Sequence, residues 1–77
     1  MKIVSFNFLG GFRLELTFSN GLQKVVDLSS FIQNAKNPMT AQFKDPNLFE
    51  RVNISHGHLS WMNGEMDLSA ESLFHWK

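Results

Sequence analysis

Residues 12–28 read FRLELTFSNGLQKVVDL, and their pattern is the clearest indication of the fold. Large apolar residues occupy every second position from Phe12 to Phe18, and polar or charged residues fill the positions between them. Because successive side chains of a strand point to opposite faces, this alternation predicts a half-buried strand. The chain then reaches Asn20-Gly21, a pair typical of hairpin turns since glycine readily adopts a positive φ. We therefore predict an antiparallel hairpin whose second strand runs from Leu22 to Leu28.

The register of this hairpin depends on the loop length. A two-residue turn on Asn20-Gly21 would set Leu14 opposite Asp27, so that an apolar side chain would face a carboxylate. A three-residue loop over residues 19–21, with its glycine left-handed, instead sets Arg13 opposite Asp27 and separates the apolar face from the polar face. We predict the second register, with the pairs Phe12–Leu28, Arg13–Asp27, Leu14–Val26 and Phe18–Leu22.

A further strand precedes this hairpin. Apolar and polar residues alternate over residues 4–8, and Gly10-Gly11 provides a turn. A three-residue loop over residues 9–11 predicts the pairs Phe8–Phe12, Phe6–Leu14 and Val4–Leu16. The result is a three-stranded meander whose inner face carries Phe, Leu and Val side chains.

The second half of the chain repeats this plan. Asn63-Gly64 leads into Asp67-Leu68-Ser69, as Asn20-Gly21 leads into Asp27-Leu28-Ser29. A second hairpin is predicted here. Its strands run from Glu50 to Ser55 and from His58 to Met62, and its turn is His56-Gly57.

Short helical segments are expected between the strands. Ser29-Ser30 are expected to cap a turn through residues 31–33, and a loop follows over residues 34–38. Residues 39–44 are expected to form a brief helix that ends at Asp45-Pro46, because the residue before a proline resists helical ψ. A last helix, capped by Ser69, would turn three side chains inward: Ala70, Leu73 and Phe74.

Together these elements predict an α+β fold: a small antiparallel β-sheet, made of a meander plus a hairpin, with short helices packed on one face. The 77 residues are expected to form a single domain over residues 1–77.

Charge and composition narrow the classes of function. Seven basic residues balance seven acidic ones and are scattered along the chain, so the positive patch that binds phosphates is missing and we expect no direct binding of nucleic acid. No apolar run approaches the roughly 20 residues that cross a bilayer, and we expect no membrane association. With no cysteine, the chain fits a reducing compartment, and we expect a cytoplasmic location.

An ordered set of motifs extends along the chain: D-P-x-L-F at residues 45–49, W-x-N-G at 61–64 and D-L at 67–68, preceded by F-S-N-G at 18–21 and V-D-L at 26–28. With these motifs, nearly the whole chain resembles the small bacterial family called domain of unknown function 2442. The resemblance implies a compact α+β domain of bacterial origin, and no particular reaction. Its members have been associated with toxin-antitoxin-like gene pairs, which implies a protein partner.

The residues that could bind a metal or catalyse a reaction are expected to have structural roles instead. The pattern His56-Gly57-His58, with His75 far along the chain, lacks the three or four converging ligands of a zinc site, so we expect no metal and no cofactor. No nucleophile or base lies at a recognised spacing, so we expect no catalytic residue and lean away from an enzyme. Three residues are instead expected to cap backbone N–H groups: Asp27, Asp67 and Ser69.

Three aromatic residues are candidates for interaction: Trp61, Phe74 and Trp76. Trp61 lies on a predicted strand, where packing in the core is the first expectation. Trp76 lies near the end of the sequence, and two alternatives stay open for it: folding back onto the core, or anchoring a partner. The leading hypothesis is a non-enzymatic interaction domain that binds a protein partner or itself. The alternative is a small-molecule-binding domain or enzyme with a pocket near Trp61, Asp67 and His56.

Overall fold

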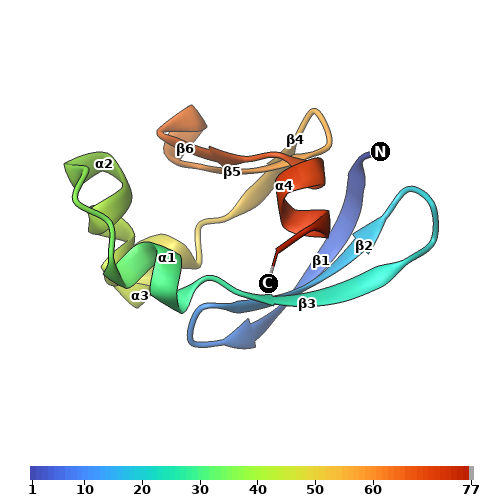
Figure 1. Cartoon of the computed structure of the whole chain (residues 1–77). Helices are drawn as coiled ribbons and strands as arrows, with labels where there is room; N and C mark the ends of the chain where they lie inside the picture. Colours follow the sequence, from blue (N-terminus) through green and yellow to red (C-terminus); the bar gives the residue numbers. More distant parts are fainter. Residues whose placement is uncertain (77) are drawn as a thin grey trace.

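The computed structural model describes residues 1–76, and it describes their side chains except that of Asn63. Antiparallel strands form two three-stranded sheets that lie opposite each other, and helices α1 to α3 gather at one end of them (Figure 1). The first sheet has the order β1-β2-β3 and the second the order β4-β5-β6. The strands are β1 Ile3–Gly10, β2 Arg13–Phe18, β3 Gln23–Asp27, β4 Asn53–Ser55, β5 His58–Trp61 and β6 Met66–Leu68.

The helical segments are all short. They are α1 Ser29–Gln33, α2 Pro38–Ala41, the 3₁₀ turn η1 Gln42–Lys44, α3 Pro46–Phe49, the 3₁₀ turn η2 Met62–Gly64 and α4 Ala70–Phe74. The predicted α+β class, with antiparallel strands and short helices, is therefore confirmed. The strands divide between two sheets because the chain leaves β3 through the helices and starts a new meander at β4.

The β2–β3 hairpin has the predicted register. Arg13 lies opposite Asp27, and Leu14 lies opposite Val26. The Gly21 N–H donates to the Phe18 carbonyl over 2.9 Å, and Gly21 has a φ of +87°, as the three-residue loop requires. The separation of the two faces, together with the turn length and the opposite charges of Arg13 and Asp27, therefore predicted this register correctly.

The predicted β1–β2 register is wrong by two residues. Phe8 lies opposite Leu14 instead of Phe12, and Phe6 lies opposite Leu16. A slip of two residues keeps every side chain on its face, so alternation alone does not distinguish the two registers. The register also shifts at two points along β1, between Ile3 and Ser5 and between Phe8 and Gly10.

The first of these irregularities changes which residue enters the core. The step from Ile3 to Ser5 opposes the single step from Phe18 to Thr17, so β1 carries one extra residue, as in a β-bulge. Ile3 is buried as a result, whereas Val4, predicted to face inward, is 57% exposed.

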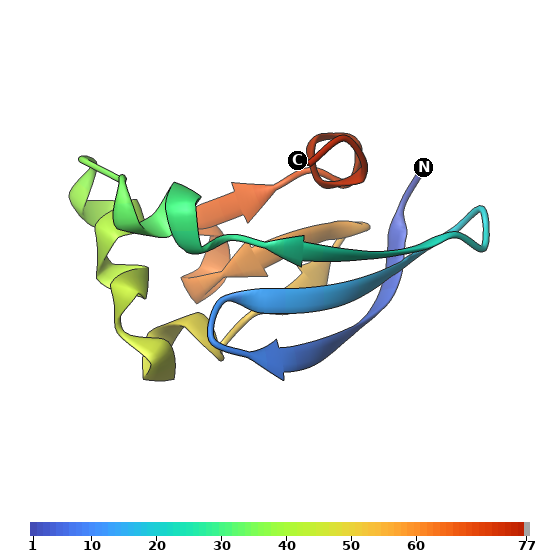
Figure 2. The same cartoon turned by 60° about the horizontal axis from the view of Figure 1, so that its bottom comes forward.

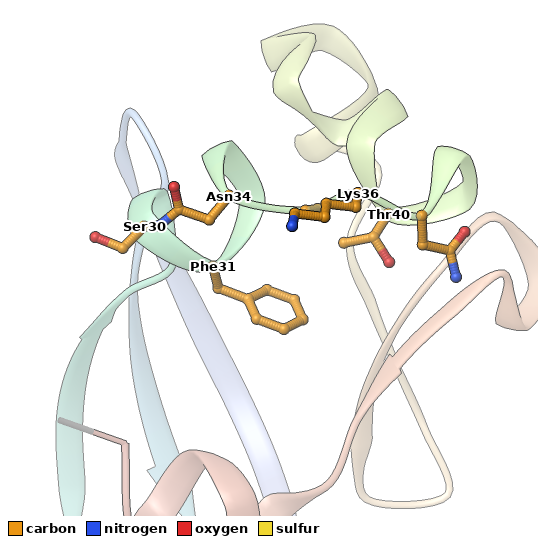
Figure 3. Close-up of a pocket in the computed structure, with 7 residues that line it drawn as sticks. Ser30, Phe31, Asn34, Lys36 and Thr40 are labelled. Carbon is orange, nitrogen blue, oxygen red and sulfur yellow. The ribbon is translucent and has the colours of Figure 1, made fainter.

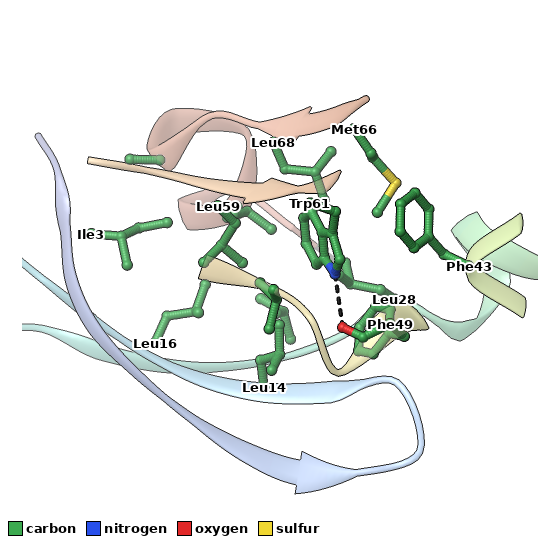
Figure 4. Close-up of a cluster of buried hydrophobic side chains, with 14 of the residues drawn as sticks. Ile3, Leu14, Leu16, Leu28, Phe43, Phe49, Leu59, Trp61, Met66 and Leu68 are labelled. Atoms are coloured by element: carbon green, nitrogen blue, oxygen red, sulfur yellow. Dashed lines mark hydrogen bonds between the residues drawn. The ribbon is translucent and has the colours of Figure 1, made fainter. Parts of the chain in front are cut away.

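The core fills the space between the two sheets (Figure 4). Leu14 and Leu16 of β2 point toward Leu59 and Trp61 of β5. Trp61 is fully buried, and its indole N–H donates to the Phe49 carbonyl over 2.8 Å. This bond satisfies the single polar atom of a large ring that is otherwise packed among apolar side chains.

The helices differ from their predicted bounds at three points. Ser29 and Ser30, predicted to cap a turn through residues 31–33, lie within α1, and the residue at the N-cap of that helix makes no capping bond through its side chain. The expected helix over residues 39–44 is present, but it begins at Pro38 and its last turn is the 3₁₀ turn η1. The expected stop at Asp45-Pro46 is also a start: α3 begins at Pro46, and the Asp45 carboxylate accepts the Asn47 N–H over 2.9 Å. Aspartate is a favoured N-cap residue and proline a favoured first helical residue, so Asp45-Pro46 contains both sequence signals for the start of a helix.

Candidate functional site

One edge of the first sheet is open. β1 is paired with β2 on one side only, and it forms the lower boundary of this sheet in Figure 2. At the start of the strand, the Ile3 N–H donates to the Gly57 carbonyl over 2.9 Å. Within residues 1–76, no backbone group of residues 4–9 bonds to any segment other than β2. A strand edge of this kind can accept a further strand.

The hydrogen bonds of β2 identify which groups of β1 point outward. The Phe18 N–H donates to the Leu22 carbonyl and the Leu28 N–H donates to the Phe12 carbonyl, so the even-numbered residues bond across the β2–β3 pair. In an antiparallel ladder, residues alternate between bonding to one neighbour and to the other. The odd-numbered residues of β2 therefore bond to β1, and Phe6 and Phe8, which oppose even-numbered residues, direct their N–H and C=O groups to the open edge.

Apolar side chains accompany these free backbone groups. Val4 is 57% exposed, Leu9 43% and Phe8 38%. No residue of β1 carries a charge, although lysine on an edge strand is a common protection against unwanted pairing. Open backbone groups and uncovered apolar side chains thus occur on the same strand.

The opposite edge of this sheet is covered near its end. The Trp76 indole N–H donates to the Asp27 carbonyl over 3.2 Å, on the side of β3 that faces away from β2. The Lys24 ammonium donates to the Phe74 carbonyl over 2.6 Å and holds the end of α4 beside β3. The two edges of the sheet therefore differ: β3 is partly covered and β1 is open.

The three aromatic candidates lie in different surroundings. Trp61 is fully buried and presents no surface to a partner. Phe74 is partly buried, with its ring 5.3 Å from that of Phe18 in an edge-to-face arrangement. Trp76 is also partly buried and packs edge-to-face on Phe31, with 5.5 Å between the ring centroids. The C-terminal rings thus fold back onto the sheet and α1.

Two of the three expected capping residues make the corresponding bonds. The Ser69 hydroxyl accepts the Ser72 N–H over 3.1 Å and caps α4. The Asp27 carboxylate accepts the Ser29 N–H over 2.9 Å just before α1. Asp67 lies exposed on β6, opposite Ser60, and within residues 1–76 its carboxylate accepts no backbone N–H. The reason is that the chain stays extended through Asp67, and α4 starts only after Ser69.

The charge of Asp27 is stabilised by its neighbours. Hydrogen bonds from the side chain and then the backbone of Ser29 lower the pKa of this carboxyl below its ordinary value of 3.8, and the nearby Arg13 guanidinium lowers it further. Asp27 is fully exposed, and its bonds are those of a local turn. The shift therefore reflects a structural role at the end of β3.

The residues of the alternative site do not converge. His56 lies in the turn that precedes β5, and Trp61 lies at the other end of that strand, facing the core. Asp67 is on the neighbouring strand and is exposed. In the part of the chain that the structure describes, His, Asp and Glu side chains form no group of three that could hold a metal ion.

An open pocket lies elsewhere, between α1 and α2 (Figure 3). Its volume is about 490 Å³. Phe31 and Ala35 supply apolar surface, and the ammonium group of Lys36 supplies the charge among the lining residues. The others are polar: Ser30, Asn34, Asn37 and Thr40. No local sequence pattern indicates this pocket, because it forms where a loop brings two helices together.

The fold defines a small α+β protein built from two antiparallel three-stranded sheets. Residues 3–77 match the sequence model of the family described as Protein of unknown function (DUF2442), and the chain belongs to this family. No curated protein and no solved structure matches the chain. Among residues 1–76, no helix has both the length and the apolar character needed to cross a membrane.

Proposed function

We propose that this chain acts as a single non-enzymatic interaction domain, and that it binds a protein by adding a strand of its partner to the open edge of β1. The observation that supports this proposal is the outward direction of the backbone groups of Phe6 and Phe8, beside the exposed side chains of Val4 and Leu9. In strand addition, backbone hydrogen bonds provide affinity and the flanking side chains provide selectivity. A protein partner also agrees with the toxin-antitoxin-like gene pairs that the family resemblance implies.

The test compares two matched valines on the two edge strands. Val4 on β1 is 57% exposed and Val25 on β3 is 53% exposed. Val4→Lys places a hydrated ammonium group at the open edge, whereas Val25→Lys adds the same charge to the face of β3. The wild type, Val4→Lys and Val25→Lys are each used as bait in affinity purification from the native host.

We expect one protein to be recovered with the wild type and with Val25→Lys. Its recovery with Val4→Lys should be at least tenfold lower. A protein recovered equally by all three baits would overturn the use of β1. Circular dichroism of each variant confirms that the fold is present.

A second candidate function is the binding of a small molecule in the pocket between α1 and α2. The observation that favours it is the combination of the Phe31 ring, a nearby cation at Lys36 and hydrogen-bonding side chains around an open volume of about 490 Å³. A saturable thermal shift by a compound, abolished by Lys36→Ala but not by Lys44→Ala, would support it. The absence of any such compound in a screen of small anions and aromatic acids would contradict it.

A further inference from the structure

We infer that the strand added to β1 is the β1 strand of a second copy of this chain, so that two three-stranded sheets join into one six-stranded sheet across a two-fold axis. This inference rests on the proposed use of the β1 edge and adds the identity of the partner. It follows from three features of the described residues: the lack of charge on the strand, the position of its outward backbone groups, and the partial cover of the opposite edge.

Charge does not oppose the pairing of two copies. β1 has no charged residue, and the seven acidic residues of the chain balance its seven basic ones. Two like-charged edges would repel each other, and a strongly charged chain would resist association. Neither effect operates here. A strand from another protein would gain nothing from charge complementarity at this edge.

The outward backbone groups fix the register. Between the two irregularities of β1, the ladder to β2 is regular over Ser5 to Phe8, and within it Phe6 and Phe8 face outward. An antiparallel second copy satisfies both residues when Phe6 lies opposite Phe8 of the other copy. The two-fold axis then passes beside Asn7, which lies opposite its own counterpart. Each Phe6 ring also lies beside a Phe8 ring, and such cross-strand aromatic pairs are favourable.

The cover at the end of the β3 edge favours an assembly that closes as a dimer. If both edges were open, β1 of one copy would also pair with β3 of the next, and head-to-tail pairing builds open filaments. The Trp76 indole occupies the Asp27 carbonyl on the outer side of β3. Pairing through β1 alone uses the same surface on both copies and therefore ends at two.

Sedimentation across protein concentrations tests the association. Between roughly 10 µM and 1 mM, a range suited to interfaces of small area, the wild type should change from monomer to dimer. Val4→Lys should weaken dimerisation at least tenfold, and Val25→Lys should leave it unchanged. Leu9→Lys, with Leu22→Lys at the tip of the other hairpin as its control, provides a second matched pair, since Leu22 is 53% exposed.

Cross-linking tests the register. The chain has no cysteine, so a single introduced thiol reports on one position. Asn7→Cys places two thiols opposite each other in a non-bonded antiparallel pair, where the Cα atoms are about 4.5 Å apart and a disulfide can form. Ser5→Cys, exposed on the same face two residues away, places its thiols roughly 13 Å apart along the strand. Mild oxidation should link Asn7→Cys at least tenfold faster than Ser5→Cys.

The outcomes separate this inference from the proposed function. A wild type that remains monomeric at all concentrations overturns the second copy as partner, and equal cross-linking of Asn7→Cys and Ser5→Cys overturns the register. In both cases the affinity purification with Val4→Lys and Val25→Lys still decides independently whether β1 binds another protein. A dimer that Val4→Lys does not weaken would overturn pairing between copies through β1, and the affinity purification would again decide separately whether β1 binds another protein.

Discussion

Gly57 and Lys2 lie close together, although Gly57 is in the β4–β5 turn of the second sheet and Lys2 precedes β1 of the first. A Cβ atom added to Gly57 would stand 2.7 Å from both Cβ and Cγ of Lys2. Next to this contact, the Ile3 N–H donates to the Gly57 carbonyl. The turn between β4 and β5 therefore holds the beginning of β1 in place, and the open part of the edge starts at Val4.

Gly57→Ala should destabilise the protein more than Gly21→Ala. Both glycines have a positive φ, +80° and +87°, so both substitutions carry a similar backbone strain. Only Gly57 has a neighbour within 4 Å, and overpacking of that kind costs about 1–3 kcal/mol. Urea unfolding of the two variants measures the difference. Equal losses would show that Lys2 moves away without cost.

Trp61→Phe should cost more than the loss of ring size. The substitution leaves the Phe49 carbonyl without its indole donor in the core, and an unpaired buried polar group costs about 1–3 kcal/mol. Phe43→Leu, which removes ring atoms from a fully buried neighbour of Trp61 without breaking a hydrogen bond, is the control. If urea unfolding gives the same loss for both variants, the hydrogen bond contributes nothing.

Asp27 should make stability depend on pH at the acid end. Its pKa is lowered in the folded state below the ordinary value of 3.8, so the unfolded chain takes up the proton first as the pH falls. The stabilisation is therefore complete above about pH 4 and is lost as the pH falls through the lower, folded pKa. The difference in unfolding free energy between the wild type and Asp27→Asn should shrink on acidification. Ser29→Ala, which removes the first cause of the shift, should reduce this pH dependence. A difference between the wild type and Asp27→Asn that stays constant with pH would contradict a role of Asp27 in acid stability.

Trp76→Ala should uncover the edge of β3. The variant loses the bond to the Asp27 carbonyl and the edge-to-face contact with Phe31, and such aromatic pairs contribute about 0.5–1.5 kcal/mol. Light scattering should then detect assemblies larger than a dimer. Trp76→Phe keeps an aromatic ring and loses only the donor, so it should associate less than Trp76→Ala. A Trp76→Ala variant that never exceeds the wild-type mass would show that the indole does not protect β3.

Sequence patterns predicted the parts of the fold that local rules determine. The β2–β3 register followed from keeping apolar residues on one face and from the pair Arg13–Asp27, because every other register breaks one of these. The Ser69 cap and the inward stripe of α4 are similarly local, and both are present. In contrast, α3 was missed because Asp45-Pro46 was interpreted only as the end of a helix.

The candidate site depends on strand register and strand order, which the alternation of apolar and polar residues does not determine. The predicted β1–β2 register was wrong because a slip of two residues leaves every side chain on its face. The extra residue near Val4 then shifts the register once more at the start of β1. Which strand forms an edge depends on the order of strands in the sheet, so the open side of β1 was not predictable. The contact of Trp76 with Asp27 joins positions 49 residues apart, and no local pattern indicates it.

Amide hydrogen exchange of β1, measured residue by residue at low and high protein concentration, shows whether the outward backbone groups of this strand pair with a second strand. At low concentration, the N–H of Asn7 should be protected by its bond to β2, while those of Phe6 and Phe8 should exchange rapidly. If two copies pair through β1, protection of the Phe6 and Phe8 N–H groups should rise at least tenfold at high concentration, while protection of the Asn7 N–H should change little. Rapid exchange of Phe6 and Phe8 at every concentration, and with every captured protein added, would contradict the claim that the β1 edge is the binding surface.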